Sequence, residues 1–66
     1  MSPERFAMRL KRLREERGLT QAALATKVGM SRAYLARLEM GRHDPPLSRL
    51  RKLAKALKVP IERLLK

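Results

Sequence analysis

The stretch TQAALATKVGMSRAYLARLEMG, residues 20–41, contains two short helical patterns with a glycine between them. Gly29 stands where the chain must reverse, because glycine adopts a positive φ without steric cost, and Ala25 is small enough for two closely crossing helices. The expected hydroxyl caps of the two helices are Thr20 and Ser31. Their expected apolar faces are Ala23, Leu24, Ala25, Val28, Leu35 and Leu38. The stretch therefore predicts a helix-turn-helix over about residues 20–40, with its second helix displayed to solvent.

The sequence before this stretch predicts one helix. It opens with Ser2, Pro3 and Glu4, which supply a hydroxyl cap, a proline suited to the first turn and an acid near the positive end of the dipole. Its apolar side chains are Phe6, Leu10 and Leu13. Gly18 stands where the helix is expected to end.

The sequence after the stretch predicts two more helices. Asp44 is expected to cap the fourth, with Pro45 and Pro46 in its first turn, and Pro60 separates it from a short fifth helix. The expected buried stripe of the fourth helix is Leu47, Leu50, Leu53, Ala54 and Leu57. The apolar residues of the fifth either close the core or form a dimer surface: Ile61, Leu64 and Leu65. We predict an all-α, five-helix fold in a single domain, residues 1–66.

The charge of the chain indicates a polyanionic partner. Seventeen Lys and Arg against six Asp and Glu give a formal net charge of +11, which attracts nucleic acid or an anionic membrane surface. No apolar run approaches the roughly 18 residues of a membrane span, and no signal-peptide pattern opens the chain. We therefore expect a cytoplasmic protein that does not enter a membrane.

The residue types argue against an enzyme. The chain has no cysteine and one histidine, its few carboxylates are scattered, and no glycine-rich loop follows a strand. His43 has no second ligand pattern beside it and is expected to be a loop residue. We expect no catalytic residue, no metal and no cofactor.

The outward face of the second helix in the quoted stretch suits a DNA groove. With Leu35 and Leu38 inward, and about 100° of rotation per residue, the outward side chains are Ala33, Ala36, Arg37 and Met40, and Arg32 lies at the edge of this arc near the amino end. Small side chains let a helix approach another surface closely. In a major groove alanine contacts thymine methyl groups, and arginine binds guanine O6 and N7 in a bidentate way. The predicted base-reading residues are Arg32, Ala33, Ala36 and Arg37.

A set of residues spread over the chain carries a family resemblance: Arg14, GLTQ at 18–21, Leu24-Ala25, Val28-Gly29, Ser31, Leu35, LE at 38–39, Gly41, Pro45 and LAKALKV at 53–59. On these residues the chain resembles the phage-repressor and Cro-type helix-turn-helix domains, also called the xenobiotic-response-element family. The resemblance runs from about Phe6 to Leu65. It implies five helices and a DNA-binding transcriptional regulator, often dimeric and more commonly a repressor.

The resemblance also implies roles for single residues. Gln21 is expected to bind backbone phosphate, and three outward residues fall at base-reading positions of the family: Arg32, Ala33 and Arg37. Met40 stands where the family commonly has an asparagine that contacts phosphate, so nearby Arg42 is the candidate to replace that contact. The further phosphate candidates are Thr20, Ser31 and Tyr34, of which Tyr34 lies on the flank of the helix, where packing is an equal alternative.

Arg14 and Glu39 are predicted to form a structural ion pair. Each lies one helical turn beyond an apolar position, so opposite charges occur at two margins of the core. The resemblance implies the same pairing. If both side chains instead reach water, the pair contributes only about 0–1 kcal/mol.

Together these features predict a sequence-specific double-stranded DNA-binding regulator, most simply a repressor. One short helix reads few base pairs, so we expect a homodimer on a palindromic operator. The alternative is an antitoxin-type module that binds a small protein partner as well as its own promoter. A membrane-active helix is disfavoured, because three glycines and the DPP at 44–46 interrupt the chain.

Overall fold

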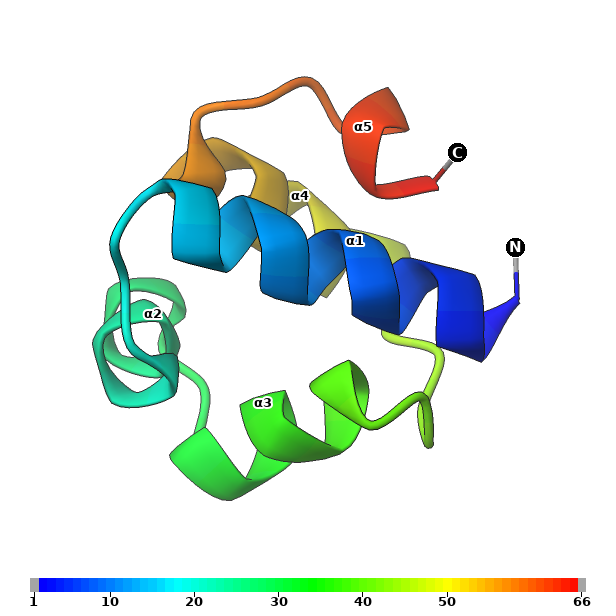
Figure 1. Cartoon of the computed structure of the whole chain (residues 1–66), viewed down its shortest axis with the longest axis horizontal. Coiled ribbons are helices and arrows are strands. Elements are labelled where there is room, and N and C mark those ends of the chain that lie inside the picture. The colour runs from blue at the N-terminus through cyan, green and yellow to red at the C-terminus, as the bar shows by residue number, and fades with distance from the viewer. Residues whose placement is uncertain (1, 66) are drawn as a thin grey trace.

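The computed structural model describes residues 2–65, which form five α-helices and no strand: α1 (Pro3–Glu16), α2 (Gln21–Val28), α3 (Arg32–Glu39), α4 (Leu47–Leu57) and α5 (Glu62–Leu65). In Figure 1, α1 crosses the middle of the molecule, with α3 below it, α5 above it and α4 behind it. The all-α, five-helix fold predicted from the sequence is confirmed.

The first three helices begin at the hydroxyl caps that the sequence predicts. Each cap oxygen accepts a hydrogen bond from the backbone N–H three residues later, over 3.0–3.2 Å, at Ser2, Thr20 and Ser31. Gly29 ends α2 with a φ of 68°, in the left-handed region. An added Cβ there meets no atom within 4 Å, so the turn needs glycine for its backbone conformation and not for space.

The prediction for the start of α4 is wrong. Pro46, not Asp44, is the N-cap residue, and it provides no side-chain hydrogen bond. Asp44 is exposed and lies outside the helix. With Asp44 as the cap, Pro45 would be the first helical residue, and the Pro46 that follows disfavours the helical conformation at Pro45. Leu47 is also not part of the buried stripe. It is the first helical residue, and 52% of its surface is exposed.

The end of α4 is held by Arg17, which the sequence did not single out. The Arg17 Nε donates to the Leu57 carbonyl oxygen over 2.7 Å, and its Nη2 donates to the Lys58 carbonyl oxygen over 3.4 Å. Lys58 closes the helix with a φ of 59°, the one positive φ at a residue other than glycine in the described chain. A guanidinium from the end of α1 thus satisfies carbonyl groups that have no partner inside α4.

The core lies where the five helices meet. Its largest fully buried side chains come from every helix: Phe6, Leu10, Leu24, Leu35, Leu38, Leu53, Leu57 and Leu64. Leu64 therefore closes the core, whereas Leu65 is 36% exposed. Ala25 is buried as predicted, but Ala23 is exposed and does not belong to the apolar face of α2.

Candidate nucleic-acid interface

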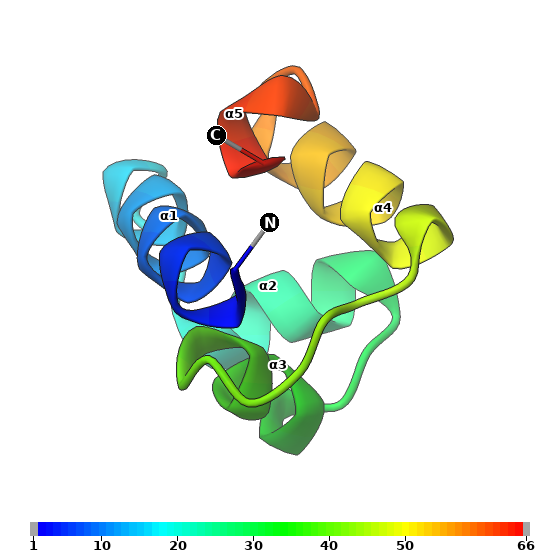
Figure 2. The same ribbon diagram turned by 90° about the vertical axis from the view of Figure 1, so that its right-hand side faces the viewer.

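One side of α3 is anchored in the core and the other faces solvent. Figures 1 and 2 both place this helix at the edge of the molecule. Leu35 and Leu38 are fully buried. The opposite side carries four exposed residues: Arg32, Ala33, Arg37 and Met40. Ala36, also predicted to read bases, is half-buried and lies at the margin of this face. We call these five residues the reading face.

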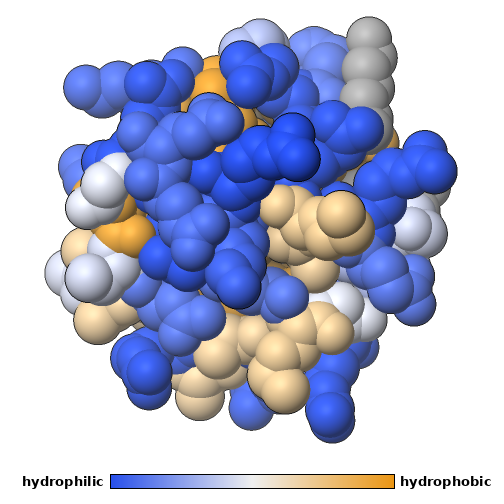
Figure 3. Space-filling view, viewed as in Figure 1, coloured by the Kyte–Doolittle hydropathy of each residue, from blue (hydrophilic) through white to orange (hydrophobic). Residues whose placement is uncertain are grey.

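The reading face combines small apolar groups with arginines. Figure 3 shows a largely hydrophilic surface on which weakly hydrophobic side chains gather along the lower edge, where α3 lies. Met40 is 61% exposed. The side chains of Arg32 and Arg37 make no hydrogen bond or ion pair with any residue between 2 and 65. Their guanidinium groups are therefore available to an external acceptor.

A buried polar network holds α3 against α1 and α2. Arg14 Nε donates to Glu39 Oε2 over 2.6 Å and Arg14 Nη2 to Glu39 Oε1 over 3.0 Å, so the predicted ion pair forms with bidentate geometry. The side chains are only 10% and 4% exposed. The Arg14 Nη1 donates to the Leu19 carbonyl oxygen over 2.7 Å. The hydrogen bond to Glu39 raises the pKa of Arg14 above its ordinary value, against the opposing effect of burial.

The start of α2 is tied to the same network. Gln21 is half-buried, and its Nε2 donates to Glu39 Oε1 over 3.2 Å. Thr20 is exposed, and its hydroxyl oxygen accepts the cap hydrogen bond from the backbone N–H of Ala23. Gln21, predicted to bind phosphate, is therefore held against Glu39, the last residue of α3, and Thr20 directly precedes it.

The segment between α3 and α4 runs from the end of α3 across the front of the view to α4 in Figure 2. The backbone N–H of Arg42 donates to the Arg37 carbonyl oxygen over 3.2 Å, which fixes the start of this segment, and the Arg42 side chain is exposed. Ser31, at the other end of α3, is exposed, and its hydroxyl oxygen accepts the cap hydrogen bond from the backbone N–H of Tyr34. Gln21 is thus held next to α3 through Glu39, and Arg42 through the Arg37 carbonyl oxygen. We call Thr20 with Gln21, and Arg42, the two borders of the reading face.

Tyr34 occupies the flank of α3 nearest to α4 and is half-buried. Its ring stacks on the ring of His43, with centroids 6.0 Å apart and planes at 28°. The Arg49 Cζ lies 4.6 Å from the centroid of the tyrosine ring. The sequence left open whether Tyr34 packs or binds phosphate, and its ring does pack. Neither His43 nor Arg49 was expected there. They follow Tyr34 by 9 and 15 positions, and no local sequence pattern connects residues that far apart.

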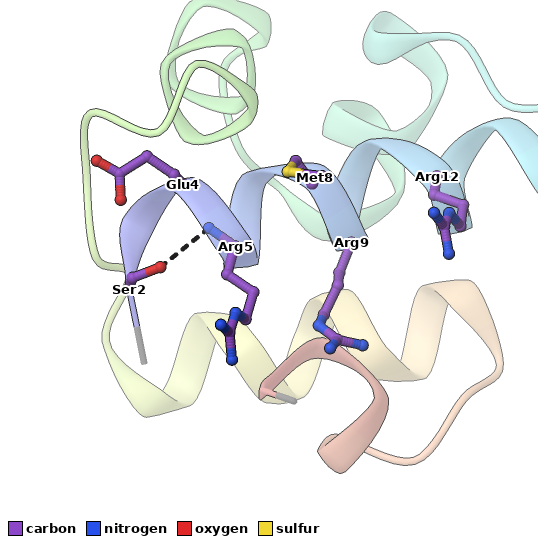
Figure 4. A pocket seen from close by; sticks show the side chains of 6 residues that line it. All are labelled: Ser2, Glu4, Arg5, Met8, Arg9 and Arg12. Atoms are coloured by element: carbon purple, nitrogen blue, oxygen red, sulfur yellow. Dashed lines mark hydrogen bonds between the residues drawn. The ribbon is translucent and has the colours of Figure 1, made fainter.

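Basic side chains also cover surfaces away from the reading face. A hollow of about 450 Å³ on α1 is lined by Ser2, Glu4, Arg5, Met8, Arg9 and Arg12. Figure 4 shows its three arginines on the side of α1 nearer to α5 and away from α3. A second hollow, of about 650 Å³, lies between the end of α2 and α4 and is bordered by Lys27, Lys52, Lys55 and Lys58. The positive charge is therefore spread over the body of the molecule.

No helix within residues 2–65 combines the length and the apolar character that a membrane crossing requires.

Comparison with known proteins identifies relatives of the chain. The HTH-type transcriptional repressor RghR of Bacillus subtilis is 46% identical over 63 residues, which cover 94% of this chain and 47% of the relative. The immunity repressor protein of Bacillus phage phi105 is 47% identical over 53 residues, which cover 80% of this chain and 37% of the relative. The chain thus spans less than half the length of these two repressors.

A solved structure and a protein family agree with these relatives. The restriction-modification controller protein C.AhdI from Aeromonas hydrophila superposes with a TM-score of 0.90 and 35% sequence identity, covering 94% of each chain. The family described as helix-turn-helix matches residues 10–64, which include the reading face, both of its borders and the buried network. On this match and these identities, the chain belongs to the helix-turn-helix family.

Proposed function

We propose that this chain is a sequence-specific, double-stranded DNA-binding transcriptional regulator of the repressor type, and not an enzyme. The observation that carries the proposal is the outer side of α3, where Arg32, Ala33 and Arg37 are exposed while Leu35 and Leu38 lock the helix into the core. The proposal is supported by the names of the relatives, two repressors and a restriction-modification controller protein.

In the proposed complex α3 lies in the major groove and supplies the base contacts. Arg32 and Arg37 have planar guanidinium groups with no partner among residues 2–65, and such groups bind guanine O6 and N7 in a bidentate way. Ala33 keeps the helix close to the bases and contacts thymine methyl groups. Ala36 makes the same type of contact at the margin of the face.

The two borders of the reading face supply the phosphate contacts. The first N–H groups of α2 have no partner inside the helix, and the helix dipole favours an anion there. The residues proposed at phosphate positions are Thr20, Gln21, Ser31 and Arg42. Tyr34 is left out of this set, because its ring packs against His43 and Arg49. Met40 has no hydrogen-bond donor, so Arg42 takes the phosphate role and Met40 contacts the DNA with apolar atoms.

We also propose that two copies bind a palindromic operator in the cytoplasm. A two-fold dimer places two α3 helices in successive major grooves, about 34–36 Å apart. Leu64 is used in the core, which leaves exposed Leu65 and half-buried Ile61 of the α5 region as the apolar residues for contact between the copies.

Selection of bound duplexes from a random library tests the proposal. The expected result is an enriched symmetric sequence whose half-sites are about one helical turn apart. Arg32→Ala should lose the preference at one position of each half-site, whereas Arg51→Ala, an exposed arginine on α4, should keep the enriched sequence. Recovery of no preferred sequence by the folded protein would reject the proposal.

A further inference from the structure

We propose that Tyr34 is a positioning residue that holds Arg49 at one border of the reading face, where the Arg49 guanidinium contacts DNA phosphate. The inference rests on the proposed function and extends it. Its basis is a stack of three side chains from three segments: Tyr34 from α3, His43 from the segment after α3, and Arg49 from the first turn of α4.

The geometry of the stack is that of specific aromatic contacts. The Arg49 Cζ is 4.6 Å from the centroid of the Tyr34 ring, within the distance at which a cation is attracted to an aromatic face. His43 stacks on the same ring at 6.0 Å. Tyr34 lies three positions before Arg37 on α3, so it is next to the reading face while it touches α4.

A stacked guanidinium keeps its ability to bind phosphate. The attraction of the guanidinium cation to the aromatic face comes from its charge, and it leaves the five N–H donors free for hydrogen bonds. Arg49 is exposed and makes no hydrogen bond or ion pair with another described residue. The stack therefore restricts the rotamers of Arg49 without using its donors, which lowers the conformational cost of a phosphate contact.

The stack also lies on the same side of α3 as Arg42. Arg42 directly precedes His43, and its backbone N–H is bonded to the Arg37 carbonyl oxygen. Holding His43 against Tyr34 thus fixes the segment that carries Arg42. The tyrosine ring is needed for this role and the tyrosine hydroxyl is not, which separates positioning from a direct phosphate contact by Tyr34.

Four substitutions test the inference by DNA titration at several salt concentrations. Tyr34→Phe keeps the ring and should bind like the unmodified chain. Tyr34→Leu and Arg49→Gln should each weaken binding to all duplexes by about three- to tenfold and lower the salt slope by about 0.9, the value of one phosphate contact. The double variant should bind no more weakly than either single variant, because both remove the same contact. Arg51→Gln removes an equal charge outside the stack and should have the smaller effect.

Thermal unfolding of each variant shows which ones are folded. If Tyr34→Leu does not fold, Arg49→Lys keeps the charge but not the planar stacking group, and it should still weaken binding. Loss of affinity in Tyr34→Phe would overturn the inference in favour of a hydroxyl contact, and full affinity in Arg49→Gln, or in both Tyr34→Leu and Arg49→Lys, would overturn it outright. Failure of the unmodified chain to bind any duplex would instead reject the proposed function.

Discussion

Arg14 and Arg32 are the same residue type on two helices of one small fold, and their surroundings differ in every respect. Arg14 is nearly buried and donates three hydrogen bonds, two to the Glu39 carboxylate and one to the Leu19 carbonyl oxygen. Arg32 is exposed and bonds to no described residue. Partner atoms and burial, not charge, therefore separate an arginine that holds the fold from one that is free to bind.

The two arginines also differ in the free energy that is lost when each is removed. Removal of one partner from a buried pair leaves the other charge in a poorly solvated site, which is costly for folding. An exposed arginine loses hydration and rotamer freedom when it binds, and its removal changes the stability of the fold little. Substitutions in the network should therefore change stability, whereas substitutions on the reading face should change binding.

The largest expected effect is that of Glu39→Ala. It leaves the Arg14 guanidinium and the Gln21 amide without the carboxylate, and should lower the free energy of unfolding by about 3–5 kcal/mol, as measured by urea denaturation. The double variant Arg14→Met and Glu39→Leu should recover part of this loss, because no buried charge remains. If the free energy of unfolding of Glu39→Ala falls by less than about 1 kcal/mol, the Arg14–Glu39 pair contributes no more than an exposed surface ion pair, which would contradict this prediction.

Arg32→Ala should give the opposite pattern. We expect binding to the preferred operator to weaken by about 1–3 kcal/mol, with relaxed preference at one base position, while the free energy of unfolding stays within about 0.5 kcal/mol. Titration of operator and random duplex in parallel measures the first effect. Unchanged discrimination between the two duplexes would show that Arg32 does not read bases.

The features that the sequence predicted well depend on local patterns. The hydroxyl caps at Ser2, Thr20 and Ser31 form as expected, because each is decided by residues within one turn. The Arg14–Glu39 pair was also found, because both residues sit beside apolar positions whose helical spacing could be read. Local spacing thus predicted the fold and the orientation of α3.

The features that were missed depend on the relative placement of distant segments. Arg17 binds carbonyl groups that lie 40 and 41 residues later, and no sequence pattern connects them. The packing of Tyr34 with Arg49 is of the same kind, since it depends on where α4 starts. That start was mispredicted through Asp44, because the local effect of two consecutive prolines outweighed the cap preference.

Gly29→Ala tests the turn between α2 and α3. Alanine in the left-handed region costs about 1–2 kcal/mol, and since no atom lies near the added methyl group, no steric clash should add to this. Thermal unfolding should show the loss, and Gly29→Asn should lose less because asparagine tolerates this conformation. A much larger loss for alanine would mean that the turn is crowded.

The smallest expected effect is that of Arg42→Gln, which separates an exposed arginine that contacts phosphate from one that contacts a base. Arg42 is exposed like Arg32, but it lies outside α3, so its contact should be to phosphate and not to a base. Operator and random duplex should therefore lose affinity by the same factor, and the salt slope should fall by about 0.9, with stability unchanged. Salt titrations of both duplexes measure this. A change in the ratio of the two affinities would contradict the assignment and extend the reading face beyond α3, because only base contacts or DNA shape distinguish one sequence from another.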